Sequence, residues 1–170
     1  MDALSYEIRA VTDASLPASL SVIRSAFKTV ADEMDLTPDN CPGHTAFITM
    51  DKLADLYGKA ACFGLYVDGT QAGFVAAEKT GDGEVYYLDR LAVLPEYRHN
   101  GYGAVLVRCV FDYMRQRGGK VVSLGMIDSH TVLKNWYKSL GFRETGTKKF
   151  AHLPFLVCFM DFDLSSQQVK

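Results

Sequence analysis

Hydrophobic and polar positions along the chain fall into short alternating or apolar runs, which are typical of strands, and longer runs of helical period. The strand-like runs are bounded by glycine, proline, asparagine and aspartate, the usual residues of turns. Strands are predicted over residues 5–10, 62–67, 72–78, 84–93, 120–127, 142–148 and 155–164.

Four segments have the 3.6-residue period of amphipathic helices. The first helix opens near Ser15 with Pro17 in its first turn, and the others are a helix at 51–59, one between Gly103 and Gly118, and one at 131–140 that ends at Gly141. The first helix is expected to turn one apolar stripe to the core, and that stripe consists of Leu20, Ile23, Phe27, Val30 and Met34.

The order of these elements indicates the fold class. The run at 84–93 is apolar on both faces, so it is expected to be a central strand covered on both sides. Hairpin connections, such as Asp68 and Gly69 at a tight turn, outnumber long crossovers. We therefore predict an α/β fold with a mixed, mostly antiparallel central sheet flanked by helices on both faces, forming a single domain over residues 1–170.

Composition limits the classes of partner and the cellular compartment that are expected. The net charge is only −2, which gives no reason to expect nucleic-acid or membrane partners. Residues 1–10 contain no apolar stretch that resembles a signal peptide, so a cytoplasmic location is expected. The spacing of the four cysteines matches no disulfide or zinc pattern. Cys41 and His44 lack a third ligand, and we expect no metal site there but turn and packing roles.

The most informative motif lies between the central strand and the third helix. It reads Arg98, His99, Asn100, Gly101, Tyr102, Gly103. Two glycines before a helix N-terminus suit a pyrophosphate, because the chain can turn sharply and present free amides. A dinucleotide fingerprint needs a small residue where Leu106 stands, and no P-loop lysine follows.

This motif, after the strand ending at Leu91, Ala92 and Val93, resembles the acyl-CoA-binding motif of the GNAT superfamily of N-acetyltransferases. The resemblance is strongest over residues 86–142. It implies that residues Arg98 to Gly103 bind the pyrophosphate of acetyl-CoA (coenzyme A) and that Leu91 to Val93 face its pantetheine arm. His130 stands where the family usually has a cofactor-binding asparagine, and a histidine also donates hydrogen bonds.

Tyr137 lies in a second segment that resembles the family, Tyr137 to Phe142. In the family this tyrosine protonates the departing CoA thiolate, which implies a catalytic role here. Its place on the apolar stripe of the helix also fits a core aromatic whose hydroxyl reaches the surface.

Attack on a thioester requires a neutral amine, because an alkyl ammonium has a pKa of about 10.4. Asp89 is the preferred general base because it is a carboxylate within an apolar strand, and Glu78 on the neighbouring strand is the alternative. A structural ion pair at Asp89 fits the sequence equally, and a base that acts through a chain of water molecules would leave no trace in the sequence. A backbone amide near Val93 is expected to stabilise the oxyanion.

The resemblance implies direct transfer of an acetyl group to a primary amine of a small molecule, amino acid or peptide. The loops at 40–44 and 150–155 are expected to shape the acceptor side. The alternatives are a non-catalytic acyl-CoA-binding sensor or regulatory module, and a purely structural domain. The aromatic strand at 155–162 is a candidate for pairing across a homodimer.

Overall fold

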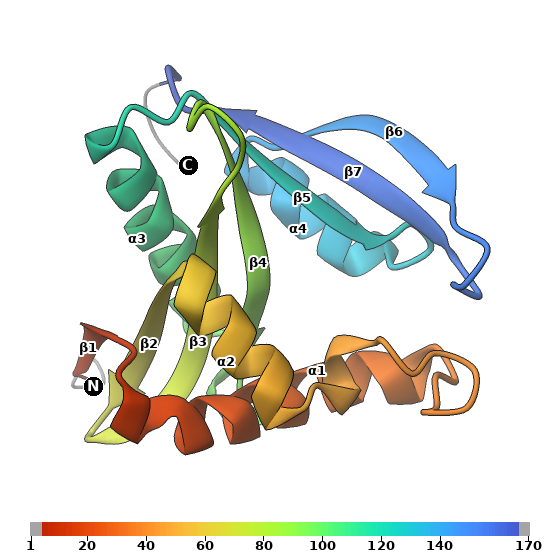
Figure 1. Cartoon of the computed structure of the whole chain (residues 1–170), viewed down its shortest axis with the longest axis horizontal. Helices are drawn as coiled ribbons and strands as arrows, with labels where there is room; N and C mark the ends of the chain where they lie inside the picture. Colours follow the sequence, from red (N-terminus) through yellow and green to blue (C-terminus); the bar gives the residue numbers. More distant parts are fainter. Residues whose placement is uncertain (1–4, 167–170) are drawn as a thin grey trace.

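The computed structural model describes residues 5–166, and Figure 1 shows the arrangement of the elements. Residues 1–4 lie outside the described residues. They belong to the segment 1–10, in which no signal peptide was expected. None of the helices in the described range is long and apolar enough to cross a membrane.

Seven strands form one mixed sheet in the order β1-β2-β3-β4-β5-β7-β6. Every neighbouring pair is antiparallel except β4 and β5, which are parallel. The predicted fold class is confirmed, and the strand bounds agree within a few residues. The strands are β1 (Tyr6–Ala10), β2 (Ala61–Val67), β3 (Thr70–Lys79), β4 (Val85–Val93), β5 (Val121–Ile127), β6 (Arg143–Lys149) and β7 (Leu156–Asp163).

Helices α1 (Leu16–Glu33) and α2 (Met50–Lys59) pack on one face of the sheet, and α3 (Tyr102–Gln116) and α4 (Thr131–Leu140) pack on the other. The alternation of β3 separates the two cores. Its Phe74 and Ala76 face α1 and α2, whereas Val75 and Ala77 face α3. Three short 3-10 turns complete the fold, namely η1 (Asp13–Ser15), η2 (Thr45–Phe47) and η3 (Pro95–Tyr97).

The buried stripe of α1 differs from the predicted one. Of the five predicted residues only Ile23 is fully buried, and the other four are partly exposed. The stripe that meets the sheet consists of smaller residues, Ser19, Val22, Ile23 and Ala26. Small side chains allow α1 to lie close to β3. The four larger predicted residues pack against the buried clusters at the flanks of this line, so hydrophobicity alone found residues that border the core but not the line of closest contact.

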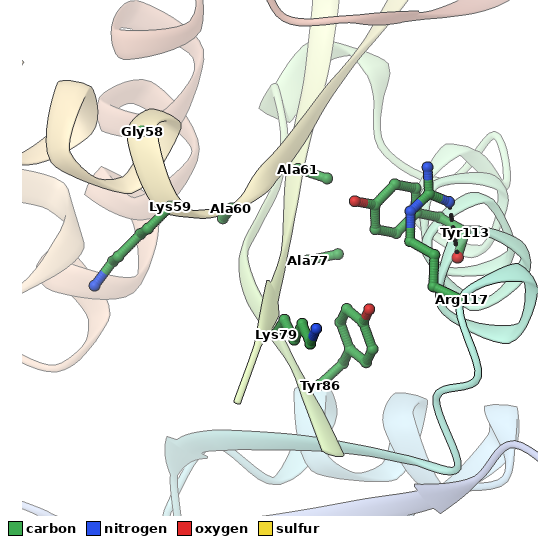
Figure 2. Close-up of a pocket in the computed structure, with 9 residues that line it drawn as sticks. All are labelled: Gly58, Lys59, Ala60, Ala61, Ala77, Lys79, Tyr86, Tyr113 and Arg117. Atoms are coloured by element: carbon green, nitrogen blue, oxygen red, sulfur yellow. Dashed lines mark hydrogen bonds between the residues drawn. The ribbon is translucent and has the colours of Figure 1, made fainter. Parts of the chain in front are cut away.

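Strands β4 and β5 meet at one end and then diverge (Figure 1). Their pairing covers only Val85 to Tyr87 with Val121 to Ser123, so the rest of β4 has no partner on that side. The divergence opens toward the N-terminus of α3. At the other end of β4, a cavity of about 560 Å³ lies beside the C-terminus of α3 (Figure 2).

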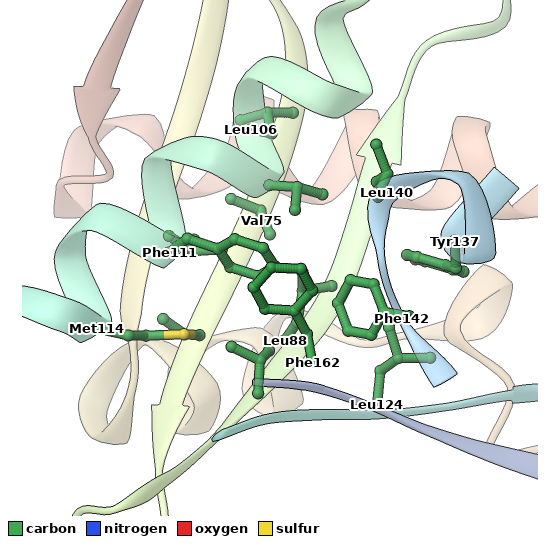
Figure 3. Close-up of a cluster of buried hydrophobic side chains, with 14 of the residues drawn as sticks. Val75, Leu88, Leu106, Phe111, Met114, Leu124, Tyr137, Leu140, Phe142 and Phe162 are labelled. Atoms are coloured by element: carbon green, nitrogen blue, oxygen red, sulfur yellow. The ribbon is translucent and has the colours of Figure 1, made fainter. Parts of the chain in front are cut away.

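The larger core fills the space between α3, α4 and the sheet (Figure 3). Phe111 of α3 stacks on Phe162 of β7 with ring centroids 4.4 Å apart, and Phe142 packs against both rings. This aromatic cluster joins the two halves of the sheet although β4 and β5 separate.

The position of β7 corrects one expectation. This strand is hydrogen-bonded to β5 on one side and to β6 on the other. An interior strand has no free backbone groups for a second chain, so pairing of residues 155–162 across a dimer is excluded. The edges of the sheet are β1 and β6.

Candidate active site

The N-terminus of α3 has the geometry of an anion-binding site. Gly101 is its N-cap residue, with φ at +81°, and no side chain among the described residues caps the helix. A Cβ built on Gly101 would meet no atom within 4 Å, so the space in front of it is open. Uncapped first-turn amides carry the partial positive charge of the helix dipole, which favours a phosphate.

The side chains of the loop hold its shape. The Arg98 guanidinium donates to the carbonyl of Ala26 at 2.9 Å and to the hydroxyl of Thr29 at 3.2 Å, and its Nε donates to the carbonyl of Val93 at 3.2 Å. Asn100 Nδ2 donates to the backbone carbonyl of Arg98 at 3.1 Å. These hydrogen bonds hold the two side chains against the protein, and the open space at Gly101 leaves the first amides of α3 accessible.

The two glycines of the motif have different tasks. Gly101 supplies a left-handed backbone conformation, whereas Gly103 allows α3 and α4 to approach, since its Cβ would lie 3.1 Å from Trp136 Cζ2. Tyr102 between them is buried and packs its ring 5.9 Å from that of Tyr6. His99 also has a positive φ, +66°, and is exposed.

A β-bulge lies in the middle of β4. Asp89 pairs with Ala76 and Ala92 pairs with Phe74, so Arg90 and Leu91 together stand opposite one residue of β3. Arg90 takes up the extra length with φ at +50°. Leu91 lies in the bulge itself, and beyond it the backbone of Ala92 and Val93 is paired with β3 only.

Asp89 lies on the α1 and α2 side of β4, at the bulge. Its Oδ2 is 2.6 Å from Nη1 of Arg90. Burial raises the pKa of Asp89 above its usual range, and the neighbouring Arg90 charge opposes this rise. The alternative base, Glu78, forms an ion pair with Lys59 at 3.3 Å. Burial raises the pKa of nearby Cys62 to about 12, so this thiol is not a nucleophile at neutral pH.

Tyr137 is 6% exposed and belongs to the core beneath α4. Its ring packs edge-on against Trp136 and Phe142, with centroids 5.0 and 5.4 Å away. Burial raises the pKa of the Tyr137 hydroxyl, which therefore keeps its proton at neutral pH. The same contacts suit both roles considered for Tyr137, the catalytic proton donor and the core aromatic.

His130 caps the helix that carries Tyr137. Its Nδ1 accepts a hydrogen bond from the Leu133 amide at 3.3 Å, and its Nε2 is 3.8 Å from Glu33 Oε2. The residue therefore occupies an N-cap position in which asparagine is also favoured.

Three loops that are distant in the sequence meet in one apolar cluster. Cys41 and Phe47 from the loop after α1 pack with Ile127 at the end of β5 and with Leu153 and Phe155 before β7. The two loops predicted for the acceptor side are thus brought together. Cys41 is 1% exposed, and His44 Nδ1 accepts from the Ala46 amide at 3.2 Å, in agreement with turn and packing roles.

A charged network under α4 escaped the sequence analysis. Lys134 Nζ lies 2.5 Å from Asp128 Oδ1 and 3.3 Å from Glu144 Oε1, and Lys138 Nζ lies 2.6 Å from Glu144 Oε2. The Lys134 ammonium thus occupies the place that a cation would take among Asp128, Glu144 and Cys158. The i and i+4 spacing of Lys134 and Lys138 was the only sequence signal of this network, since their acidic partners lie outside α4.

The network makes stability depend on pH. Hydrogen bonds from Lys138, Cys158 and Lys134 lower the pKa of Glu144 to about 2, from an ordinary value of 4.5. The unfolded chain therefore binds this proton first as the pH falls, and the stabilisation is lost between about pH 4.5 and pH 2. Glu144→Gln is expected to have a lower Tm than the wild type at pH 7, and thermal unfolding should show the gap closing toward pH 2. A gap of constant size would contradict this assignment.

The comparisons with known proteins agree with this geometry. The model of the acetyltransferase (GNAT) family matches residues 29–142, more than half of the chain. The chain belongs to the GNAT acetyltransferase family. A curated relative, a probable N-acetyltransferase camello from Xenopus tropicalis, is 32% identical over 87 residues, which are 50% of this chain and 40% of the relative.

Solved structures share the fold at lower sequence identity. The ribosomal-protein-S18-alanine N-acetyltransferase from Escherichia coli has a TM-score of 0.76 and 20% identity, with 96% of each chain covered. The PaiA N-acetyltransferase from Thermoplasma acidophilum, crystallised with coenzyme A, has a TM-score of 0.76 and 18% identity, with 94% of this chain and 99% of that chain covered.

Proposed function

We propose that this chain is an acetyl-CoA-dependent N-acetyltransferase that transfers the acetyl group directly to a primary amine of a small molecule, amino acid or peptide. The observation that carries the proposal is the uncapped N-terminus of α3 beside the free edge of β4. The N-terminus of α3 suits a pyrophosphate, and the free edge of β4 suits an extended arm with amide groups.

The described residues fit acetyl-CoA as donor substrate. The open space at Gly101 leaves room for phosphate oxygens against the amides of residues 99–103, and the unpaired edge of Leu91 to Val93 suits backbone hydrogen bonds to pantetheine. Arg98, Asn100 and His130 support the site by holding the loop and the start of α4 in place. The bound thioester supplies the activated acetyl group.

Asp89 is proposed as the general base that takes a proton from the acceptor amine. Its raised pKa makes it a stronger base than an ordinary aspartate. Arg90 contacts the same carboxylate, and its Nε is buried with no partner among the described residues. Glu78 and a water chain remain alternatives, and an amide near Val93 is proposed to stabilise the oxyanion.

The hydroxyl of Tyr137 is proposed to donate a hydrogen bond to the sulfur of the leaving thiolate. Its raised pKa keeps the hydroxyl protonated but makes it a weaker acid than ordinary tyrosine. Since a thiol has a reference pKa of about 8.5, the thiolate leaves without full proton transfer. Tyr137 is therefore expected to matter less than the base.

The test has two stages. Thermal unfolding with saturating CoA, acetyl-CoA and, as a control, NAD is expected to give a higher Tm with the first two ligands only. Ligand at about 100 times its Kd adds about 2.7 kcal/mol of stability. A panel of amines with acetyl-CoA is then expected to release free thiol above the spontaneous rate. Stabilisation without release for any amine would favour the non-catalytic sensor, and no stabilisation by either CoA ligand would refute the proposal.

A further inference from the structure

A second concave region lies far from Gly101, beside the opposite end of α3. At about 1.5 Å per residue, this helix separates the two places by about 22 Å. The cavity of about 560 Å³ has a floor of small residues, Ala61 and Ala77, and walls formed by Lys79, Tyr86, Tyr113 and Arg117 (Figure 2). Its volume lies within the range of small-molecule sites, about 300–1,000 Å³.

The hydroxyl of Tyr86 borders this cavity. The residue is only 3% exposed, and its ring lies edge-on to Tyr113, with centroids 6.4 Å apart. Its oxygen forms no hydrogen bond within residues 5–166 and points into the cavity (Figure 2). The hydroxyl is therefore free to hydrogen-bond to whatever occupies the cavity, and it both donates and accepts.

Two cations border the same space. The Arg117 guanidinium lies 3.6 Å from the ring centroid of Tyr113 and donates to its backbone carbonyl at 3.2 Å, which fixes its orientation. Lys79 bends over Gly83, whose Cβ would lie 2.5 Å from Lys79 Cε, and its ammonium forms no ion pair with the residues that the structure describes. Stacked arginines retain donors for a bidentate contact with an anion.

No carboxylate offsets these charges inside the cavity. None of the lining side chains among the described residues is acidic. Of the carboxylates on the adjoining segments, Glu78 pairs with Lys59 at 3.3 Å and Glu84 with Lys120 at 2.9 Å, and Asp82 Oδ1 accepts from the Glu84 amide at 3.0 Å. The Lys59 ammonium itself points away from the cavity (Figure 2).

We propose that this cavity is a second ligand site, separate from the acetyl-transfer site, and that its ligand is a small organic anion. A phosphate or carboxylate group lies between Lys79 and Arg117 and accepts a hydrogen bond from Tyr86. An aromatic or short apolar part covers Ala61 and Ala77. The proposal does not depend on acetyl transfer, because none of these residues belongs to the glycine loop or to β4 beyond its bulge.

Calorimetric titration with phenyl phosphate at low salt tests the proposal. The wild type is expected to bind it saturably and more tightly than inorganic phosphate, which has no ring to place on the apolar floor. Lys79→Gln and Arg117→Gln are each expected to weaken binding at least about tenfold, since each loses a hydrogen bond to a charged group. Tyr86→Phe, which removes only the hydroxyl, is expected to weaken it about fivefold.

Matched controls locate the binding. Lys28→Gln on α1 and Tyr66→Phe on β2 make the same chemical changes outside the cavity and are expected to keep the wild-type affinity. The surface variant Lys79→Gln keeps the test valid if Tyr86→Phe fails to fold. The absence of saturable binding would overturn the proposal. So would equal affinities in all variants, or a loss of binding in Gly101→Val alone, which would assign the anion to α3.

Discussion

Asp89→Asn is expected to lower kcat for acetyl transfer by about 10²- to 10⁴-fold, the usual contribution of a general base. Asparagine keeps the size of the side chain and an oxygen that accepts from Arg90, so the bulge in β4 is preserved. What the variant loses is the ability to take a proton from the amine. Steady-state thiol release, with an acceptor found in the amine panel, measures the effect.

The pH profile separates a base from a structural ion pair. In the wild type, kcat/KM is expected to fall as the pH drops through the pKa of Asp89, which burial places above the usual aspartate range. Asp89→Asn is expected to lack this acidic limb. A structural role would reduce activity by a similar factor at every pH and would leave the limb in place.

Two variants complete the comparison. Glu78→Gln removes the alternative base, and Glu84→Gln removes a carboxylate that pairs with Lys120 at the far end of the sheet. We expect Glu84→Gln to behave like the wild type. A large loss of kcat in Glu78→Gln together with an active Asp89→Asn would transfer the role to Glu78. Tyr137→Phe is expected to lose less activity than Asp89→Asn.

Gly101→Val is expected to weaken CoA binding by about 10- to 100-fold. A valine at φ +81° strains the backbone and fills the open space before the amides of α3. The loss of one amide hydrogen bond to a charged phosphate costs about 1.5–3 kcal/mol, and about 1.4 kcal/mol corresponds to a factor of ten in Kd. Trp136 is the only tryptophan and lies against Gly103, so its fluorescence reports binding at this loop.

Gly69→Val is the matched control. Gly69, in the turn between β2 and β3, has φ +83°, and a Cβ added to it would also meet no atom within 4 Å. Both variants are expected to lose about 1–2 kcal/mol of stability from the left-handed conformation. Only Gly101→Val is expected to lose CoA affinity. Equal affinities in the two variants would show that the N-terminus of α3 does not hold the pyrophosphate.

Local periodicity made most of the fold predictable. The strands β2 and β3, the turn at Asp68 and Gly69, and the helix α3 depend on neighbours within a few residues, and all were found where expected. The glycine motif was equally local, because a strand, a sharp turn and a helix N-terminus follow one another directly.

Other parts of the site depend on contacts between distant segments. The bulge at Arg90 arises from the register between β4 and β3, and no residue type in the sequence predicts it. The hydrogen bonds of the Arg98 side chain could not be predicted either, because its partners, Ala26 and Thr29, lie on α1, about 70 positions earlier in the chain.

The sequence by itself thus determined the elements, the mixed sheet and the glycine turn before α3, since each follows from the period and the residue types of one segment. Only the tertiary structure decided that β7 lies inside the sheet, that β4 and β5 diverge, and which side of α1 is buried. Strand order, register and close packing arise from long-range pairing and side-chain volume, which a local pattern does not specify.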